Sequence, residues 1–459
     1  MLYRGNQSRR AFLKRSGALS VAGAAAPFVT NLAAIGEAAA ATAADYKAIV
    51  CIFLAGGNDY ANTLTTYDQA SWDLYNGQRS NIALQRDALA ATALTPTVAL
   101  PGGRQYALAP ALAPLLPIWA AGDLAPVLNV GTLVRPTTKA QYQAGSIALP
   151  PKLFSHNDQQ SYWQSSMAEG APSGWGGRIG DIFQAGNSTA ATTCVSVSGN
   201  AVFLSGKTTV QYSIGSGGPV GLSGRTAIFG SSVAATALKS LMSTGGTTFN
   251  FANEHAAVSK RSLDLFDTIN TALAGAPAAN FTGYPTGNPL ADQLKMVARM
   301  IATSQATGTK RQVFFVQLGG FDTHSNLTLK HPQLMQQLGE AMAAFYNSTV
   351  QLGVANQVTT FTASDFGRTL TSNDDGSDHG WGSHHFVMGG AVKGGRFYGT
   401  APAVGINTPD DVGQGRLLPS TSVDQYAATL ASWFGVSASD LPTVLPNIGN
   451  FGSANLGFV

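Results

Sequence analysis

The sequence predicts an α/β fold with a large, mostly parallel sheet and helices on both of its faces. Three apolar runs carry this prediction, at residues 48–55, 312–318 and 357–363, and each stops shortly before an aspartate. Continuous runs rich in β-branched and aromatic residues are typical of strands that are covered on both faces. Residues 331–351 place apolar side chains at helical spacing between the second and third run, which indicates a strand–helix–strand unit with a parallel crossover.

The other expected elements continue this alternation. They are helices at 255–273, 288–306 and 424–434 and a buried strand at 124–130. Residues 186–250 are rich in Gly, Ser and Thr and hold short alternating runs, so we expect an insertion of short strands and loops there. Residues 45–459 are long enough for one large domain or two smaller ones, and we expect a single one.

Residues 1–44 are predicted to be a twin-arginine signal peptide. The pair Arg9-Arg10 precedes Phe-Leu-Lys, a moderately apolar stretch at 17–29 and an alanine-rich segment at 38–44 that offers cleavage sites. The alternative is a basic start to a membrane anchor, but an apolar stretch this short is a poor spanning helix. We therefore expect export by the twin-arginine route to the periplasm or the cell exterior, with no membrane span in the mature protein.

The charge of the mature chain argues against a nucleic-acid partner. The full chain carries +3, and residues 1–44 hold five cationic side chains and one anionic one, which leaves −1 for the rest. The sequence shows no basic cluster interleaved with aromatic residues, which is the usual mark of nucleic-acid binding.

The two cysteines allow two interpretations. Cys51 and Cys194 both lie in apolar runs. An exported protein can join them in a disulfide. Buried free thiols are the alternative.

The residues after the three apolar runs predict a metal site. Asp59, Asp322 and Asp365 each follow one of the runs within a few residues. Sites in open α/β sheets gather beyond the carboxyl ends of the strands, so neighbouring strands would bring these carboxylates together. Converging carboxylates repel one another unless a cation or shared protons offset the charge. A cation at this edge of the sheet is our leading interpretation.

Two of these aspartates have an ordinary alternative role. Asp59 lies in a Gly-Gly-Asn-Asp turn, which can be an Asx turn that caps the next helix. Asp365 can instead form a structural ion pair with Arg368.

Four of the seven histidines fall in two short segments, which strengthens the metal interpretation. His324 follows Asp322 by two residues, and the second segment holds Asp378, His379, His384 and His385. Mixed His and Asp ligands suit zinc, manganese or iron, and neighbouring glycines let several side chains face one point. We expect a divalent cation, with zinc, manganese and calcium as candidates. The alternative is a set of capping and loop histidines on a polar rim.

A further segment, Ser155-His156, opens a predicted helix that includes Tyr162-Trp163-Gln164. A helix N-terminus favours anions, so this segment can hold a phosphate, a sulfate or a nucleophile. Ordinary capping by Asn157 or Asp158 is the alternative.

Taken together, the order of these motifs resembles a known family. The motifs are the twin-arginine leader, 53–59, Ser155-His156 before 162–164, 322–324, 364–369, Asp378-His379 and the glycine-rich 389–395. They resemble the exported bacterial family DUF1501, a domain of unknown function, over nearly the whole mature chain. That family is similar in turn to the alkaline phosphatase and sulfatase superfamily.

The resemblance implies an alkaline-phosphatase-like α/β sandwich with a metal centre at the strand ends. It implies that the early ligand is Asp59 and that a later set supplies the rest, namely Asp322, His324, Asp378, His379 and either His384 or His385. Two features depart from the superfamily pattern. Asp365 is followed by Phe366 rather than by a histidine, and no clear nucleophile stands out among Thr63, Ser155 and Ser161.

The expected function is that of a metal-dependent hydrolase of phosphate or sulfate esters. The metal would polarise the ester oxygen and activate Ser155 or a water, His156 would orient the substrate anion, and Arg368 would pair with that anion. The alternative is a non-catalytic exported protein with a structural metal that binds a partner or a surface polysaccharide. The unclear nucleophile and the insertion at 186–250 motivate this alternative.

Overall fold

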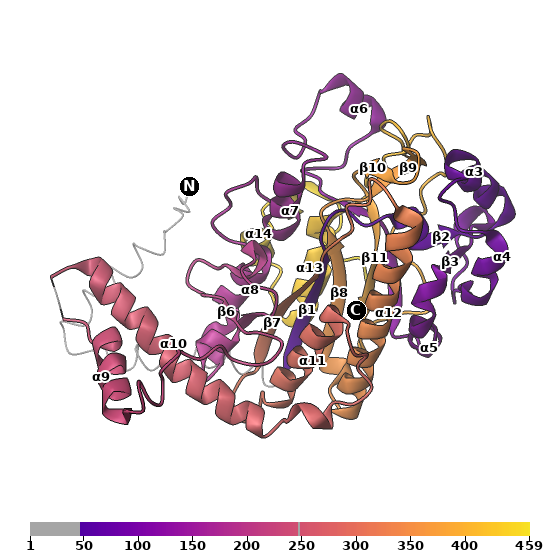
Figure 1. The fold of residues 1–459 in the computed structure, drawn as a ribbon. Coiled ribbons are helices and arrows are strands. Elements are labelled where there is room, and N and C mark those ends of the chain that lie inside the picture. The colour runs from indigo at the N-terminus through magenta and orange to yellow at the C-terminus, as the bar shows by residue number, and fades with distance from the viewer. Residues whose placement is uncertain (1–45, 247) are drawn as a thin grey trace, which may run out of the picture. The chain divides into compact units, whose positions relative to one another are not determined.

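The computed structural model describes residues 46–246 and 248–459, with an eight-stranded sheet at the centre (Figure 1). The predicted signal peptide, residues 1–44, lies outside the described residues. In spatial order the strands are β12 (Thr421–Ser422), β4 (Leu124–Gly131), β11 (Ser383–Met388), β8 (Val358–Ser364), β1 (Lys47–Leu54), β7 (Arg311–Leu318), β5 (Cys194–Ser196) and β6 (Tyr212–Ser213). Every pairing is parallel except the two that β11 makes with its neighbours. The predicted large, mostly parallel sheet is confirmed.

Strand β1 shows why the central strands read as unbroken apolar runs. Its alternate residues Val50 and Ile52 belong to one hydrophobic core, and Ile49 and Cys51 belong to the other. Because both faces of the sheet are covered, each face needs apolar side chains, and the polar alternation of a half-exposed strand is absent. Residues 48–54 are at most 2% exposed.

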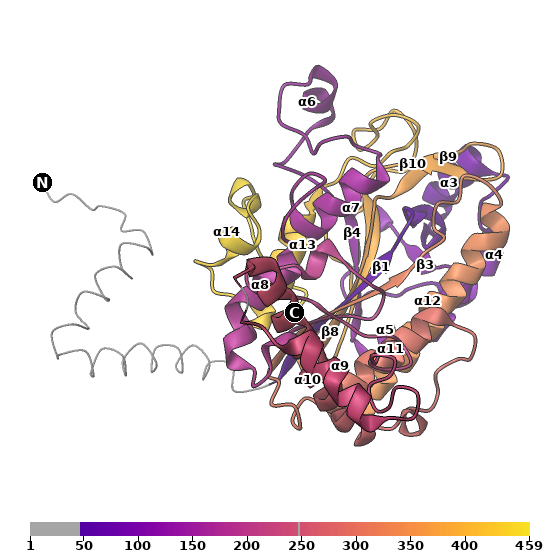
Figure 2. The same cartoon turned by 60° about the vertical axis from the view of Figure 1, so that its left-hand side comes forward.

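Helices cover both faces of the sheet, as predicted (Figure 2). One face packs against α5 (Leu116–Ala121), α10 (Asn250–Ala274), α11 (Pro289–Ala302) and α12 (Leu327–Gln351). The other packs against α7 (His156–Ser165), α8 (Trp175–Phe183), α13 (Val423–Phe434) and α14 (Leu441–Val444). Helix α12 connects β7 to β8, and β1 lies between these two strands and parallel to both. The predicted strand–helix–strand unit is therefore present.

Shorter elements surround this framework. They are β2 (Leu64–Thr66) paired with β3 (Tyr106–Leu108), β9 (Arg368–Ser372) paired with β10 (Ser377–His379), and the helices α3 (Gln69–Arg79), α4 (Arg86–Leu89), α6 (Lys139–Ala144) and α9 (Ser232–Ser243). The β9–β10 hairpin follows β8 and carries His379 to the N-terminus of α7, where its ring meets that of His156. Within the glycine-rich stretch 186–250, β5 and β6 extend one edge of the main sheet.

The two cysteines are buried free thiols, so the disulfide alternative does not apply. In the described part of the chain, no helix combines the length and hydropathy that crossing a membrane requires.

The loop after β1 fits against its neighbours through Gly56. This residue has φ of 118°, a backbone conformation that side chains disfavour, and a Cβ atom there would lie 2.3 Å from the backbone nitrogen of Asp322. The amide of Gly56 donates to Asp365 Oδ1 (3.1 Å) and its carbonyl accepts from Arg368 Nη1 (3.0 Å). The absence of a side chain at Gly56 thus lets the loops that follow β1, β7 and β8 touch.

We expect Gly56→Ala to lower the melting temperature by about 3 °C, because the added methyl group meets rigid backbone and the φ angle is strained. Gly77→Ala is the matched control: Gly77 lies within α3 and an added Cβ has no neighbour within 4 Å, so a small increase is expected. Thermal unfolding followed by circular dichroism measures both. A Gly56→Ala protein that melts with the wild type would contradict this account of the loop.

Candidate metal centre

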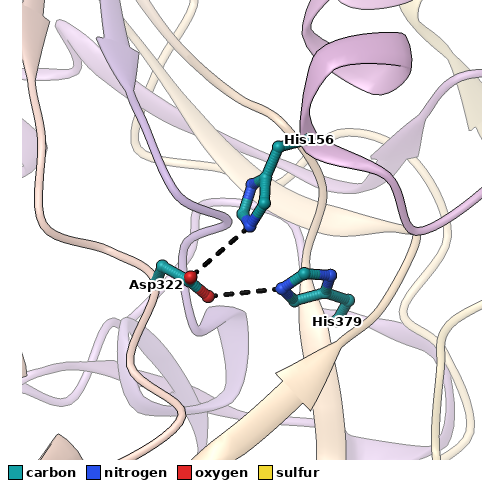
Figure 3. Close-up of side chains that lie close together, drawn as sticks. All are labelled: His156, Asp322 and His379. Atoms are coloured by element: carbon teal, nitrogen blue, oxygen red, sulfur yellow. Dashed lines mark hydrogen bonds and ion pairs between the residues drawn. The ribbon is translucent and has the colours of Figure 1, made fainter.

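Three side chains from distant parts of the chain meet at the carboxyl end of the sheet (Figure 3). His156 is the first residue of α7, Asp322 follows β7, and His379 ends β10. One donor atom from each lies within 4.8 Å of the others. His156 Nε2 is 3.5 Å from Asp322 Oδ2, and His379 Nε2 is 3.3 Å from Asp322 Oδ1.

His324 adds a third imidazole to this group. Its Nε2 atom lies 3.2 Å from Asp322 Oδ1 and 2.9 Å from His379 Nε2. The side chains of Asp322 and His324 are each 46% exposed, so a ligand from solvent can reach them. We call His156, Asp322, His324 and His379 the histidine cluster.

Hydrogen bonds at Nδ1 determine the tautomer of each imidazole, and so whether its Nε2 atom carries a lone pair. His156 Nδ1 bonds Asp365 Oδ2 (2.6 Å), His324 Nδ1 bonds Asp378 Oδ1 (3.1 Å), and His379 Nδ1 bonds the carbonyl of Phe154 (2.7 Å). Carbonyl and carboxylate oxygens only accept, so each Nδ1 carries the hydrogen. A neutral ring then has its lone pair on Nε2, and all three Nε2 atoms face Asp322. Metal-binding histidines are usually oriented in this way.

Without a cation or an extra proton, these lone pairs repel one another. The Nε2 atoms of His324 and His379 are only 2.9 Å apart. Zinc bonds of about 2.0–2.1 Å place tetrahedral ligand atoms about 3.3–3.4 Å apart. The four donor pairs measured in the cluster span 2.9–3.5 Å. The donor types, and the spacing of these four pairs, are those that a small divalent cation needs.

The pKa shifts of Asp322 and His379 agree with this donor set, whereas that of His156 favours a protonated ring unless a cation displaces the proton. Burial acts to raise the pKa of Asp322, but the hydrogen bond and charge of Arg368 outweigh it and hold that pKa below its usual value. Burial lowers the pKa of His379, which favours the neutral ring that a cation requires. The hydrogen bond with Asp365 raises the pKa of His156 against the effect of burial.

Two buried groups hold the cluster in place. Arg368 is fully buried, and its Nη1 donates to Asp322 Oδ1 (2.9 Å) while its Nε donates to the carbonyl of Ser377 (2.9 Å). Asp365 is also fully buried and accepts from His156 and from Gln160 Nε2 (2.8 Å). Their position under the cluster indicates that they orient its ligands.

Phe154 provides a further support that the sequence did not reveal. Its φ of 72° lies in the left-handed region, which costs a residue with a side chain about 1–2 kcal/mol. Its carbonyl accepts from His379 Nδ1 in this conformation. Backbone in such a region is often found at functional sites, where neighbouring contacts maintain it.

The structure brings together some of the predicted site residues and separates others. His156, Asp322, His324 and His379 form the cluster, while Asp365, Asp378 and Arg368 bond directly to it. Ser155 precedes His156, and its hydroxyl donates to Asp158 Oδ2 (2.9 Å) but accepts no capping hydrogen bond from the helix backbone. Asp59, His384 and His385 make no contact with the cluster in the described part of the chain.

His384 and His385 are buried on β11. His384 Nδ1 accepts from the amide of Asn129 (3.1 Å), and its ring packs against Tyr60. His385 packs against Trp163, 4.8 Å between ring centroids. Burial lowers the pKa of both to about 3, so both are neutral core side chains.

Asp59 forms a buried ion pair with Arg79, a residue that no sequence pattern linked to it. Arg79 Nη1 lies 3.0 Å from Asp59 Oδ1 and Nη2 lies 2.5 Å from Oδ2. Asp59 also accepts from Ser377 Oγ (2.8 Å) and caps the short helix Tyr60–Asn62. Although burial acts to raise the pKa of Asp59, Arg79 lowers it to about 2.

This pair gives a prediction for acid stability. Because the pKa of Asp59 falls from 3.8 to about 2 on folding, its contribution is complete above pH 3.8 and is lost as the pH falls through about 2. In Arg79→Met the buried carboxylate loses the cation that is bonded to it, so we expect a loss of about 3–5 kcal/mol at pH 7. In this variant the pKa of Asp59 is higher in the folded state than in the unfolded state. The difference in unfolding free energy between the variant and the wild type should therefore shrink as the pH falls from 7 to 5.

Urea unfolding at both pH values measures these differences. Arg261→Met is the control, because its ion pair with Glu254 is exposed and contributes at most about 1 kcal/mol. Equal losses in the two variants, or an Arg79→Met deficit that does not depend on pH, would show that Asp59 does not depend on Arg79.

Comparisons with known proteins place the chain in a family. Solved structures similar to the chain at low identity include the C-terminal periplasmic domain of EcEptC from Escherichia coli, with 10% identity, a TM-score of 0.33, and coverage of 87% of this chain and 86% of that one. The lipoteichoic acid synthase LtaP from Listeria monocytogenes has 8% identity, a TM-score of 0.32, and coverage of 89% of this chain and 76% of that one. A variant of the alkaline phosphatase PafA has 9% identity, a TM-score of 0.27, and coverage of 71% of this chain and 64% of that one. No curated protein sequence matches the chain. Residues 46–441 match the family described as "Protein of unknown function (DUF1501)", and the chain belongs to that family.

Proposed function

We propose that the chain is an exported, metal-dependent hydrolase of phosphate or sulfate esters. The observation that carries the proposal is the convergence of three imidazole Nε2 atoms on the half-exposed carboxylate of Asp322, each imidazole being oriented through Nδ1. The proposal of export depends on the signal predicted at residues 1–44.

The donor set favours zinc or manganese over calcium. Three imidazoles and one carboxylate suit zinc and related transition ions, whereas calcium takes six to eight oxygen ligands. The ligands in the proposal are His156, Asp322, His324 and His379. Asp365 and Asp378 bond the Nδ1 atoms of His156 and His324 and so hold these rings in place.

A divalent cation bound there would polarise an ester oxygen and increase the acidity of a water molecule. The Ser155 oxygen would attack phosphorus or sulfur while its proton passes to Asp158, and the bond to the leaving oxygen would break, with a proton taken up to give the alcohol. Water would then hydrolyse the serine ester, which releases inorganic phosphate or sulfate and restores the serine. Arg368 is fully buried beneath Asp322 and bonded to it, so we assign it to positioning this ligand and not to contact with the substrate.

Ser155 is the nucleophile in this proposal. It lies directly before His156 at the N-terminus of α7, and its hydroxyl donates to the carboxylate of Asp158 at 2.9 Å. A carboxylate that accepts the hydroxyl proton is the kind of neighbour that activates a serine. The partial positive charge of the helix N-terminus also favours an anionic group there.

We expect His379→Ala to bind zinc at least 100-fold more weakly than the wild type and to lose ester hydrolysis, because one ligand is removed. His255→Ala is the matched control, because His255 is exposed on α10 away from the cluster. Elemental analysis of the purified proteins and hydrolysis of p-nitrophenyl phosphate and p-nitrophenyl sulfate measure both. A folded wild type that contains metal but hydrolyses neither ester would favour the alternative of a structural metal.

We expect Ser155→Ala to retain its metal and to lose hydrolysis by a factor of about 10²–10⁴, since only the nucleophile is removed. Elemental analysis and initial rates on the same esters test this. A Ser155→Ala protein with unchanged rates would assign the attack to water.

A further inference from the structure

A second cavity lies beside the histidine cluster, and α7 belongs to both, because it carries His156 of the cluster and Gln160 of the cavity lining. The cavity has a volume of about 260 Å³ and lies between α7, the loop after β5 and the carboxyl end of β7. At about 30 Å³ per water molecule it has room for eight or nine waters, which is the scale of a single sugar ring. Five of its lining side chains are carboxamides: Asn157, Gln160, Gln164, Asn200 and Gln317.

In several of these carboxamides either the oxygen or the nitrogen is hydrogen-bonded within the protein, which orients the group, and the other atom is left to bind a ligand. Gln160 Nε2 donates to Asp365, Gln164 Oε1 accepts from the amide of Phe203 (3.0 Å), and Asn200 Oδ1 accepts from Gln211 Nε2 (3.0 Å). Asn157 and Gln317 are exposed, and their side chains make no hydrogen bond to the described residues. The cavity therefore presents both donors and acceptors that the protein itself does not use.

The chemistry of the lining selects against an anion. Glu169 is the only ionisable residue among the described lining residues, and it is acidic. Strong anion sites usually contain a cationic side chain, and the described lining residues include no Lys, Arg or His. Carboxamides donate and accept at once, as do the hydroxyl groups of a sugar. A neutral molecule with several hydroxyl groups matches this lining.

We propose that this cavity binds one neutral sugar unit. Gln160 links the cavity to the cluster, because it lies one helical turn after His156 and both bond the same oxygen of Asp365. Gln317 lies on β7, five residues before Asp322. If the proposed hydrolase function holds, the substrate is a phosphate or sulfate ester of a carbohydrate, with the ester group at the cluster and the sugar in this cavity.

Sugar binding is measured directly and without turnover. The probes are the methyl glycosides of glucose, galactose, mannose and N-acetylglucosamine, and the readout is saturation-transfer NMR on the full chain after treatment with EDTA. We expect at least one glycoside to bind and its Kd to rise about 3–10-fold in Asn157→Ala and in Gln317→Ala, since each removes one hydrogen-bonding group. Gln336→Ala is the control, because its side chain is exposed on α12 and bonds only Glu340. Thermal melting shows that the variants fold.

Three results would overturn the proposal. They are binding of none of the four glycosides, binding that both cavity variants leave unchanged, and displacement of the glycoside by inorganic phosphate, which would indicate an anion site. Hydrolysis is not part of this measurement. A protein that binds the glycoside but hydrolyses no ester therefore contradicts the hydrolase and supports the sugar site, and a hydrolase that binds no glycoside does the reverse.

Discussion

The parallel alignment of β1, β7 and β8 is the constraint on which the site depends. Leu54 at the end of β1 pairs with Leu318 of β7 and with Ser364 of β8, so all three strands end at the same level. The loops that carry Asp322 and Asp365 therefore leave the sheet side by side. The N-terminus of α7 reaches the same place through the bond between His156 and Asp365. The geometry of the cluster is thus set by backbone pairing in the core.

Burial divides the three strand-end carboxylates between two roles. Asp59 and Asp365 are both fully buried. Arg79 neutralises Asp59, and His156 is hydrogen-bonded to Asp365. A buried carboxylate is costly without such partners. Asp322 remains half exposed and faces three imidazoles, so it is the strand-end carboxylate that an external ligand can reach. The same sequence pattern therefore produces two supporting groups and one candidate ligand.

The sequence allowed the sheet to be predicted well and the site only in part. Apolar runs identify β1, β7 and β8 and the residues at which they end, because a strand that is buried on both faces is apolar at nearly every position. The direction of a side chain leaves no such signal: His384 and His385 are neighbours in sequence but lie on a buried strand and pack into the core. Arg79 is twenty residues from Asp59 and meets it only through the packing of α3. The bond from His379 to the carbonyl of Phe154 could not be predicted either, because every residue has a backbone carbonyl whatever its side chain.

The central claim is that one cation joins the histidine cluster of His156, Asp322, His324 and His379. The most direct test is an anomalous difference map from a crystal of the full chain, recorded at the zinc and manganese absorption edges. The account predicts a single strong peak within bonding distance of Asp322 and of the Nε2 atoms of His156, His324 and His379. A map with no peak there, or with its peak beside Asp59 or His384, would contradict it.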